Sequence, residues 1–546
     1  MKIRTFTLFA LFSFSIFSLS DLFSQARINQ ITKLGNRFCI FTESNWYKDA
    51  LLVAGTSAYF NEGWKATLIK YDNKGSILET FYLPDTIETS GYSFWDKGLI
   101  IDQDTIIHTA SVGFVDPDQL EGMVFKLNMN NEFITSKIYK SAYFPTEQFC
   151  RFKDFIKLQN GFAVLSSEWR NFDDAQCGIL RLDENFNKIW RYNYGQNISK
   201  EFPSQIFQLT NGHFVVLANS TNLDISDEFY GMSRGYYRSY IFEVDEEGNL
   251  VWEWKSPDRS EAGYAGHLIN DSTLVVAAGN GTVVCFDPGD PNSQCHFEWT
   301  GEAYKFNLNT REKIWETSMS GGQQNTMFDN SYRDIIPSIE NDGFILCGEA
   351  YYGSYEGCAQ VDTTVKCWNF PGIIAKVSNN GDSIWMRKYF GVTDVWESNQ
   401  LHDAEITPDS GYSFVGEAFN PWQGDDQGQF GWLLMTDKYG CLVPGCQLVS
   451  STNEPVQNNS ETDISFKIYP NPAVSIVNVL ITQSLLPDAV LHLIDESGNE
   501  LDQWRNFEKG ATYMIPVDNY PAGIYFLNMT YGNSIVGNEK LIISHQ

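Results

Sequence analysis

The sequence predicts an all-β protein in which a seven-bladed β-propeller is followed by a small antiparallel β-sandwich. Three observations predict this fold class. Aromatic residues make up 15% of the chain and 42 residues are Gly, one hairpin pattern recurs seven times, and a different strand pattern follows a polar segment near the C-terminus. Aromatic residues favour strands, and glycines favour tight turns. A chain of 546 residues, 43% of them hydrophobic, is long enough for more than one domain.

The charge balance excludes one class of function. The chain has 38 Lys and Arg residues against 68 Asp and Glu residues, which gives a formal net charge of -30. A surface this acidic repels a phosphate backbone, and the sequence has no local basic patch. We therefore expect no nucleic-acid partner.

Residues 1–26 are predicted to be a secretory signal peptide. Lys2 and Arg4 precede an apolar run from Phe6 to Leu19, and Ser24-Gln25-Ala26 offers small residues for cleavage. The apolar run is shorter than the roughly 20 residues that span a bilayer. We expect a mature chain outside the cytoplasm, with no transmembrane segment.

The hairpin repeat lies between residues 64 and 446. In each copy an alternating apolar arm ends in a turn, and a second arm follows. Side-chain oxygens of the residues that open the turns can accept backbone N–H bonds, and a residue with positive φ closes each turn. The openers are Asp72, Asn128, Asp183, Asp245, Asn307, Ser378 and Asp437, and the turn residues are Gly75, Asn131, Phe186, Gly248, Arg311, Gly381 and Gly440, which lie 55 to 70 residues apart.

A further apolar strand, and often a second one, precedes each hairpin, which gives four strands in about 60 residues and predicts a propeller over residues 27–448. Two propellers, an open solenoid and a chain of sandwiches are less favoured, because no linker interrupts the repeats. Pro444 and Gly445 disfavour a strand in the last hairpin. We expect residues 27–33 to help close the ring there.

The Trp-bearing arms resemble the repeats of pyrroloquinoline-quinone-like propellers. Four copies place Trp at one position (Trp190, Trp252, Trp315 and Trp385), and the segment from Asn307 to Trp315 comes closest to the family pattern. The resemblance implies that the Trp packs blade on blade. It does not imply a quinone, and we expect no cofactor. Calcium is conceivable at the acidic loops of residues 116–118 and 424–426, but no calcium motif supports it.

Residues 449–463 are polar and predict a linker. Residues 464–546 resemble the C-terminal sorting domain (type A) of type IX secretion substrates of the Bacteroidetes. The matching segments are Ile468–Pro472, Leu493–Gly498, Pro521–Leu527 and Glu539–Ile543. The resemblance implies an immunoglobulin-like β-sandwich that the type IX translocon recognises, and a protein that is secreted or placed on the cell surface via the periplasm. An ordinary adhesive sandwich is the alternative.

The ten cysteines fit an oxidising compartment. Three pairs close in sequence are predicted disulfides: Cys285–Cys295, Cys358–Cys367 and Cys441–Cys446. Cys150 and Cys177 form a weaker fourth candidate pair. Cys39 and Cys347 lie in apolar runs and are expected to be buried thiols. No C-x-x-C spacing indicates a metal site.

No catalytic constellation stands out, and no metal site is predicted. His267 has a faint resemblance to the His-bearing segments of arylsulfotransferase propellers, but it lacks partners. Loop length is more informative, because the loops between the second and third strands of copies four to seven are long and aromatic. The candidate binding residues on these loops are Tyr230, Tyr236, Tyr237, Trp299, Tyr351, Tyr352, Tyr355, Trp368 and Trp422.

These patterns favour an exported protein whose propeller binds a glycan or a protein without catalysis. The alternative is an extracellular propeller enzyme, either polysaccharide-active or arylsulfotransferase-like. A structural surface-layer protein is the third possibility. The aromatic loops equally suit internal packing, in which the rings hold the loops onto the propeller.

Overall fold

The computed structural model describes most of both predicted domains. The described residues are 27–34, 38–59, 63–83, 92–93, 97–113, 120–140, 150–171, 174–195, 199–222, 237–257, 261–285, 295–319, 327–353, 369–392, 397–420, 428–442, 446–448, 466–482, 489–495, 498–531 and 534–544. The predicted signal peptide and linker lie outside them. Two compact units are present, a large one of residues 26–442 and 451–458 and a small one centred on residues 459–546.

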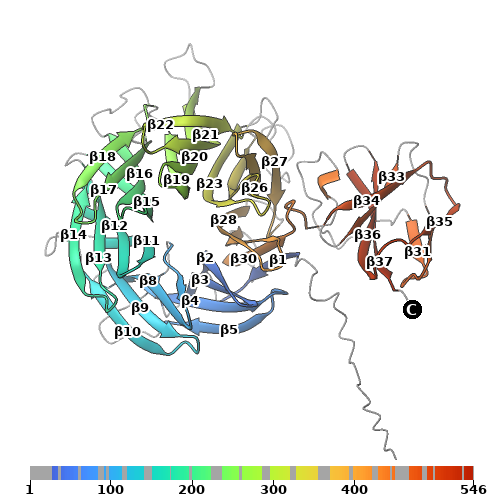
Figure 1. Ribbon diagram of the computed structural model, residues 1–546, viewed down its shortest axis with the longest axis horizontal. Coiled ribbons are helices and arrows are strands. Elements are labelled where there is room, and N and C mark those ends of the chain that lie inside the picture. Colours follow the sequence, from blue (N-terminus) through green and yellow to red (C-terminus); the bar gives the residue numbers. More distant parts are fainter. Residues whose placement is uncertain are drawn as a thin grey trace, which may run out of the picture. The chain divides into compact units, whose positions relative to one another are not determined.

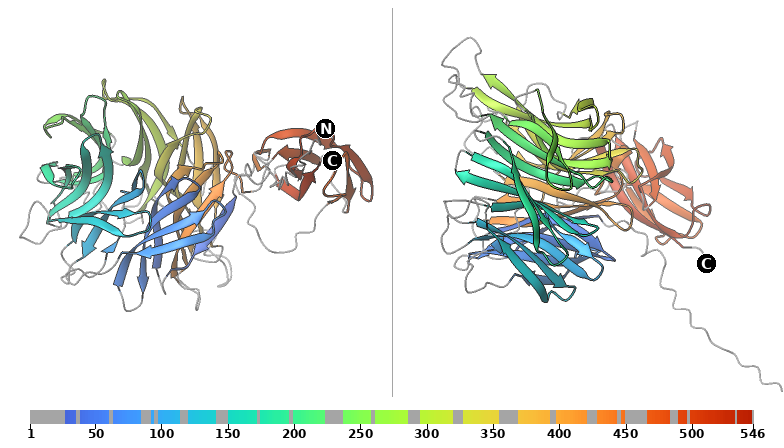
Figure 2. Two further views of the ribbon diagram at one scale, coloured as in Figure 1. Left: turned by 60° about the horizontal axis from the view of Figure 1, so that its bottom comes forward. Right: turned by 60° about the vertical axis from the view of Figure 1, so that its left-hand side comes forward.

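The large unit is a ring of antiparallel meanders (Figure 1). Its strands are β1 (Ile28–Thr32), β2 (Phe38–Tyr47), β3 (Ala50–Tyr59), β4 (Gly63–Asp72), β5 (Ile77–Tyr82), β6 (Tyr92–Ser93), β7 (Ile100–Asp102), β8 (Thr105–Gly113), β9 (Leu120–Asn128), β10 (Phe133–Tyr139), β11 (Cys150–Leu158), β12 (Gly161–Asn171), β13 (Asp174–Leu182), β14 (Lys188–Tyr194), β15 (Ser199–Gln208), β16 (Phe214–Asn222), β17 (Tyr237–Val244), β18 (Leu250–Lys255), β19 (Glu261–Asn270), β20 (Thr273–Cys285), β21 (Cys295–Asn307), β22 (Glu312–Ser318), β23 (Met327–Pro337), β24 (Gly343–Gly353), β25 (Asn369–Phe370), β26 (Gly372–Ser378), β27 (Ser383–Tyr389), β28 (Glu397–Ile406), β29 (Tyr412–Asn420) and β30 (Gly428–Thr436). Figure 2 shows the strong twist of these sheets.

Antiparallel pairing within the described residues joins the strands into successive groups: β2–β5, β6–β10, β11–β14, β15–β18, β19–β22, β23–β27, and β28–β30 with β1. The first strand of each group lies nearest the axis of the ring, and the last lies on its outer edge (Figure 1). The all-β, propeller-like fold predicted from the sequence is confirmed.

The hairpin turns form for the predicted reason. Asp72 Oδ1 accepts the backbone N–H groups of Lys74 and Ser76, both at 2.8 Å. Side-chain oxygens of Asn128, Asp183, Asp245, Asn307, Ser378 and Asp437 accept backbone N–H groups in the same way. The seven predicted turn residues all have positive φ, between 60° and 90°. Each turn therefore depends on a local side chain and one left-handed residue.

The four repeated tryptophans each contact the turn of the following group. Trp190 donates its Nε1–H to the carbonyl of Glu246, and Trp315 does so to Asn379, both at 3.0 Å. A Cβ on Gly440 would lie 2.8 Å from the Trp385 ring. The guanidinium of Arg311 lies over the Trp252 ring, 5.2 Å from its centre. Arg311 occupies the position at which pyrroloquinoline-quinone-like repeats have Gly. The predicted packing of Trp between neighbouring blades is confirmed.

The N-terminal strand β1 completes the last group. It pairs antiparallel with β30 over five residues, from Ile28 opposite Met435 to Thr32 opposite Gly431. Trp432 donates its indole N–H to Asn29 Oδ1 at 2.7 Å. The two ends of the ring are thus joined by hydrogen bonds, as expected for residues 27–33.

The cysteine predictions have mixed outcomes. Cys441 and Cys446 are disulfide-bonded, at the start of the short 3-10 turn η3 (Cys446–Leu448). Cys39 and Cys347 are buried free thiols, as expected. Cys285 lies opposite Cys295 in the β20–β21 ladder, but their side chains, and the Cys358–Cys367 pair, lie outside the described residues.

The suggested Cys150–Cys177 bond is wrong, because both thiols are free. Cys150 is on β11 and Cys177 is on β13, and β12 lies between them. Two strand spacings separate the residues by about 9–10 Å. A disulfide needs Cα atoms within roughly 7 Å.

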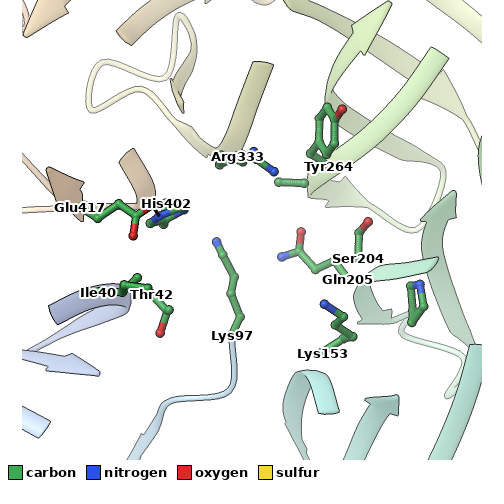
Figure 3. A pocket seen from close by; sticks show the side chains of 12 residues that line it. Ile40, Thr42, Lys97, Lys153, Ser204, Gln205, Tyr264, Arg333, His402 and Glu417 are labelled. Atoms are coloured by element: carbon green, nitrogen blue, oxygen red, sulfur yellow. Dashed lines mark ion pairs between the residues drawn. The ribbon is translucent and has the colours of Figure 1, made fainter. Parts of the chain in front are cut away.

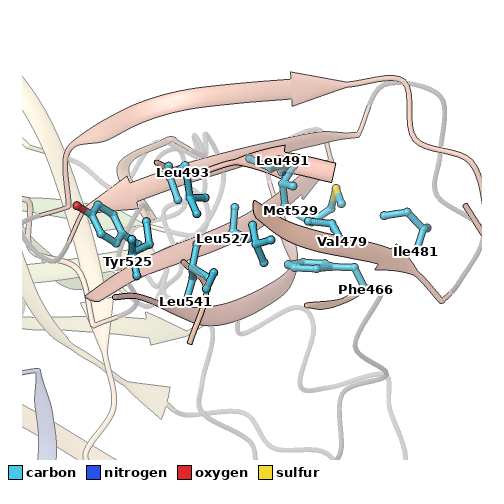
Figure 4. Packing of buried hydrophobic residues seen from close by; sticks show 14 of the residues in the cluster. Phe466, Val479, Ile481, Leu491, Leu493, Tyr525, Leu527, Met529 and Leu541 are labelled. Atoms are coloured by element: carbon cyan, nitrogen blue, oxygen red, sulfur yellow. The ribbon is translucent and has the colours of Figure 1, made fainter. Parts of the chain in front are cut away.

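The small unit contains two antiparallel sheets. One has the order β31 (Phe466–Tyr469), β32 (Ile476–Ile481) and β35 (Thr512–Pro516); the other has the order β34 (Glu500–Arg505), β33 (Val490–Asp495), β36 (Gly523–Tyr531) and β37 (Ser534–Ile543). Buried side chains from both sheets form one core, which includes Phe466, Val479, Leu493, Leu527 and Leu541 (Figure 4). The small unit is a β-sandwich with its own core.

Candidate functional site

A cavity of about 290 Å³ lies on the axis of the ring, among its innermost strands (Figure 3). The lining residues are Ile40, Thr42, Lys97, Lys153, Pro203, Ser204, Gln205, Tyr264, Ala265, Arg333, His402 and Glu417. Most of them are polar or charged, although the surrounding cores between the sheets are apolar.

A repeated backbone irregularity explains this lining. On each of six innermost strands the pairing with the next strand skips one residue, which is a β-bulge. The skipped residues are Thr42 on β2, Lys153 on β11, Ser204 on β15, Tyr264 on β19, Arg333 on β23 and His402 on β28. All six line the cavity, and Lys97, just before β7, supplies the lining residue of the remaining group. The bulge thus aims one side chain at the axis in each of six groups.

The residue after the bulge links neighbouring groups. Asp154 Oδ2 accepts the N–H of Ile206 at 2.8 Å, and Asp334 Oδ2 accepts that of Ala404 at 3.0 Å. Equivalent bonds run from Ser44 to Asp403, from Gly98 and Leu99 to Glu43, and from Gly266 to Gln205. Each bond gives a backbone N–H group of the next group of strands a partner outside the strand ladder.

Two groups of strands lack this side-chain bond to the next group. Gly98 and Ala265 stand where the other groups have Asp, Glu or Gln, and neither has a side-chain acceptor. In the first case Asp154 compensates, because its Oδ1 accepts its neighbour Phe155 N–H at 2.8 Å. The missing bond at Ala265 has no such replacement among the described residues, and it lies beside Tyr264 and Arg333. The cavity wall is therefore built differently on that side.

Lys97 neutralises the carboxylates at the floor of the cavity. Its Nζ pairs with Asp334 and lies 3.0 Å from Asp403 Oδ1. Burial alone would lower the pKa of Lys97, but the two carboxylates raise it well above its usual value. Lys97 is therefore a fixed cation on the axis.

The carboxyl groups around Lys97 hold their protons more tightly than usual. Burial raises the pKa of Asp154 and of Asp403 to about 6. Burial and the nearby Asp403 raise the pKa of Glu405 to about 8 and that of Glu43 well above its usual range. A buried carboxylate loses hydration, so its neutral form is favoured.

On the opposite wall Arg333 has a fixed orientation. Its Nη2 donates to Glu349 Oε1 at 2.6 Å, and its guanidinium lies 5.4 Å from the centre of the Tyr264 ring. The Arg333 side chain nevertheless remains 37% exposed. A guanidinium stacked and held on one edge is presented to a ligand with little loss of entropy.

His402 and Glu417 lie together on a third side of the cavity (Figure 3). His402 Nε2 is buried, lies 3.9 Å from Glu417 Oε1 and has no hydrogen-bond partner. Glu417 Oε2 accepts a bond from Gln429. A buried polar atom without a partner is unusual in a folded protein, and a group bound in the adjacent cavity would supply the missing hydrogen bond.

Among the described residues, no aromatic side chain predicted to form the binding face lines this cavity. Tyr230, Tyr236, Tyr355, Trp368 and Trp422 lie outside the described residues. Trp299, Tyr351 and Tyr352 lie on strands β21 and β24, which continue further than the expected loop boundaries, and their side chains are not described. Tyr237 packs against Phe202 at 6.1 Å, and Phe202 packs against Trp169.

Among the other candidates, the described residue His267 is not one of those that line the cavity. His267 on β19 packs 6.1 Å from the Phe344 ring, and burial lowers its pKa. The predicted acidic loops, residues 116–118 and 424–426, lie outside the described residues. Carboxylate oxygens of Glu261, Glu302 and Glu316 lie within 4.8 Å of one another, but Lys313 pairs with two of the three and supplies positive charge there.

Sequence reasoning missed all the bulge residues. A signal was present, because the inner strands carry a large apolar residue, a variable residue and then an acceptor, as in Phe152-Lys153-Asp154, Tyr332-Arg333-Asp334 and Leu401-His402-Asp403. The variable residue reaches the axis. Without the pairing register, its alternation with buried neighbours is indistinguishable from that of an ordinary strand.

The strand pairing and the polar axial cavity define this protein as an all-β, propeller-like protein with a separate C-terminal sandwich. Similar solved structures include an ulvan lyase of a new polysaccharide lyase family (10% identity, 76% of this chain and 95% of that chain covered, TM-score 0.42). They also include the α-L-arabinofuranosidase Arb93A from Fusarium graminearum (10% identity, 76% and 98%, TM-score 0.36) and the propeller domain of the Trilobed protease from Pyrococcus furiosus (8%, 72% and 93%, 0.33).

Residues 467–544 match the family model of the secretion system C-terminal sorting domain, which confirms the family predicted for the tail. This sorting domain indicates export to the cell surface or release from the cell. Among the described residues no helix is long and apolar enough to cross a membrane. No curated protein matches the sequence. The resemblance of the repeats to pyrroloquinoline-quinone-like propellers stays a prediction.

Proposed function

We propose that this is an exported binding protein whose propeller recognises a glycan in the axial cavity. One observation carries the proposal: six bulges and Lys97 direct polar side chains from every group of strands into a single cavity. Bulges next to functional sites re-aim side chains at a local cost in ladder hydrogen bonds. Structural packing alone does not require a polar residue at each of these positions.

The size of the cavity favours a glycan over a folded protein as the ligand. A volume of about 290 Å³ is at the lower end for ligand sites and suits one sugar unit or the end of a chain. Hydroxyl, amide and aromatic groups from Thr42, Ser204, Gln205 and Tyr264 match the mixed polarity of a sugar ring. A protein ligand is the weaker alternative and would contact the aromatic loops instead.

Filling the cavity tests this proposal. We expect Ser204→Trp to abolish binding of the oligosaccharides that the wild-type protein retains in a glycan screen, because Ser204 lies at a bulge facing the cavity. Ser136→Trp is the matched control, since Ser136 is exposed on the outer strand β10. Equal glycan binding by both variants, with circular dichroism unchanged, would refute the axial site.

An enzyme acting on a glycan is the second candidate, favoured by the unpartnered His402 Nε2 close to Glu417 and in the same cavity as Tyr264. These groups offer general acid–base chemistry. Turnover of a bound polysaccharide that is lost in His402→Gln, with binding retained, would establish catalysis. Binding without turnover would leave the protein a binding module.

Two finer features of the architecture belong to the same proposal. The seven successive groups of strands support a seven-bladed propeller. The sandwich of residues 466–544 supports an immunoglobulin-like sorting domain that the type IX translocon recognises as its partner. Attachment of the sorting-domain sequence to a neutral reporter behind a signal peptide, in a type IX-competent cell, tests the second point.

A further inference from the structure

We propose that the axial cavity selects sugars that carry an anionic group, either a carboxylate or a sulfate ester. This inference rests on the proposed function, because it names the chemical class of the glycan that the same cavity binds. Two features support it: the charges that line the cavity, and the ion pairs and hydrogen bonds that the nearby carboxylates already make.

Cations dominate the ionisable lining. Lys97, Lys153 and Arg333 face the cavity, and Glu417 is the one carboxylate among the described lining residues. Figure 3 shows the amino groups of Lys97 and Lys153 directed toward its middle, with Arg333 on the wall beyond. Lys153 and Arg333 both occupy bulge positions, so the same backbone irregularity that builds the cavity also presents these charges.

The carboxylates beneath the cavity already have partners. Asp334 and Asp403 pair with Lys97 and accept backbone N–H groups of the next strands. Glu43 accepts two backbone N–H groups at 2.6 Å. Burial raises the pKa of Glu43 well above its usual range, so this carboxyl group adds little negative charge beside the cavity at neutral pH.

Arg333 has the geometry of an oxyanion receptor. Glu349 holds one edge of its guanidinium, and Tyr264 supports the plane. A planar guanidinium binds the two oxygens of a carboxylate or sulfate in parallel, and such charge-assisted pairs are stronger than neutral hydrogen bonds. The second cation, Lys153, binds as a point charge and tolerates either anion.

The acidic surface makes this cluster informative. With a net charge of -30, the protein repels anions over most of its surface. Two or more cations gathered at one polar cavity therefore serve a local purpose. General attraction of an anionic polymer to the protein is excluded by the same charge.

Isothermal titration calorimetry with matched sugars tests the inference. The probes are trigalacturonic acid, its fully methyl-esterified form, a sulfated carrageenan tetrasaccharide, the desulfated tetrasaccharide and maltotriose. We expect one of the two anionic probes to bind at least about tenfold more tightly than its neutralised counterpart, because a hydrogen bond to a charged group is lost. The probe that shows this difference identifies carboxylate or sulfate as the group.

Two variants locate the charge at the cavity. Arg333→Met and Lys153→Met should each weaken binding of the preferred anion about tenfold or more and reduce its dependence on salt concentration. Lys188→Met on the exposed surface of β14 is the control and should bind like the wild type. Lys153→Met keeps the test valid if loss of the Glu349 contact unfolds Arg333→Met.

The results distinguish a failure of the anion selectivity from a failure of the glycan site itself. Equal binding of the anionic and neutralised probes, with loss of both in Ser204→Trp, would overturn the anion selectivity and leave the glycan site standing. Anion binding that survives in both cation variants would also overturn it. Failure of every probe and of a wider glycan screen to bind would contradict the proposed function itself.

Discussion

Asp154 shows how one buried residue serves both the ring and the cavity. It is 6% exposed and accepts the N–H groups of Ile206 and Phe155, which joins two neighbouring groups of strands. Burial raises its pKa from 3.8 to about 6. The unfolded chain therefore releases this proton at lower pH than the folded protein does, so the contribution of Asp154 to stability falls as pH rises from about 4 to 6.

We predict that Asp154→Asn reduces this loss. Asn keeps an acceptor oxygen for Ile206 and has no proton to release in this range. Between pH 4 and pH 7, the free energy of unfolding of the wild type should therefore fall by about 3 kcal/mol more than that of the variant. Urea denaturation at the two pH values measures this difference.

Asp183→Asn is the control with the opposite sign. Asp183 lies on an exposed turn, where hydrogen bonds from the side chain and backbone of Asn187 lower its pKa. Its ionised form favours the folded state, and this contribution is lost as pH falls. Identical pH dependence of the Asp154→Asn variant and the wild type would contradict the assignment.

At the scale of the element, the hairpin and its tryptophan form one unit with the turn of the next hairpin. Gly381 has φ of 90°, and a Cβ there would lie 2.7 Å from the Trp315 ring. The same ring donates to the neighbouring Asn379 carbonyl. A side chain at position 381 is disfavoured both by the backbone and by the ring that packs on it.

We predict that Gly381→Ala destabilises the large unit by about 2–3 kcal/mol, measured from its unfolding midpoint in guanidinium chloride. Gly510→Ala in the small unit is the matched control. Gly510 has φ of 77° and nothing within 4 Å of an added Cβ, so only the backbone strain of about 1 kcal/mol applies. Equal costs at the two sites would show that the Trp315 contact contributes nothing.

At the scale of the whole molecule, the two units have separate cores. The core of the small unit is built from residues 466–543. The large unit closes on itself through β1 and β30. Two units with independent cores are expected to fold independently.

We predict that a chain truncated after residue 448 folds into the same ring but does not reach the cell surface. The sorting domain lies entirely in the deleted part. Fractionation of cells that express the full-length and truncated chains, with limited proteolysis to verify folding, measures this. Normal surface delivery of the truncated chain would contradict the role of the tail.

The repeats, turns and sorting domain were predictable from the sequence because each depends on residues close together in the chain. Asp72 and Gly75 define a turn within four residues, and Trp190 lies only four residues after the turn residue Phe186. The repeat multiplies such local signals. The partner of each Trp, and the extension of β20 and β21 into a predicted loop, depended on contacts between distant segments.

The chain by itself determined a repeating, strand-rich protein with an export tail, since hydrophobic alternation, turn chemistry and motif order are local properties. Only the tertiary structure decided where the proposed ligand site lies. Lys153, Arg333 and His402 are far apart in the chain, and each looks like one more residue of an amphipathic strand. Closure of the ring brings the innermost strands around one axis, and a shift of pairing register by a single residue turns these side chains into the cavity.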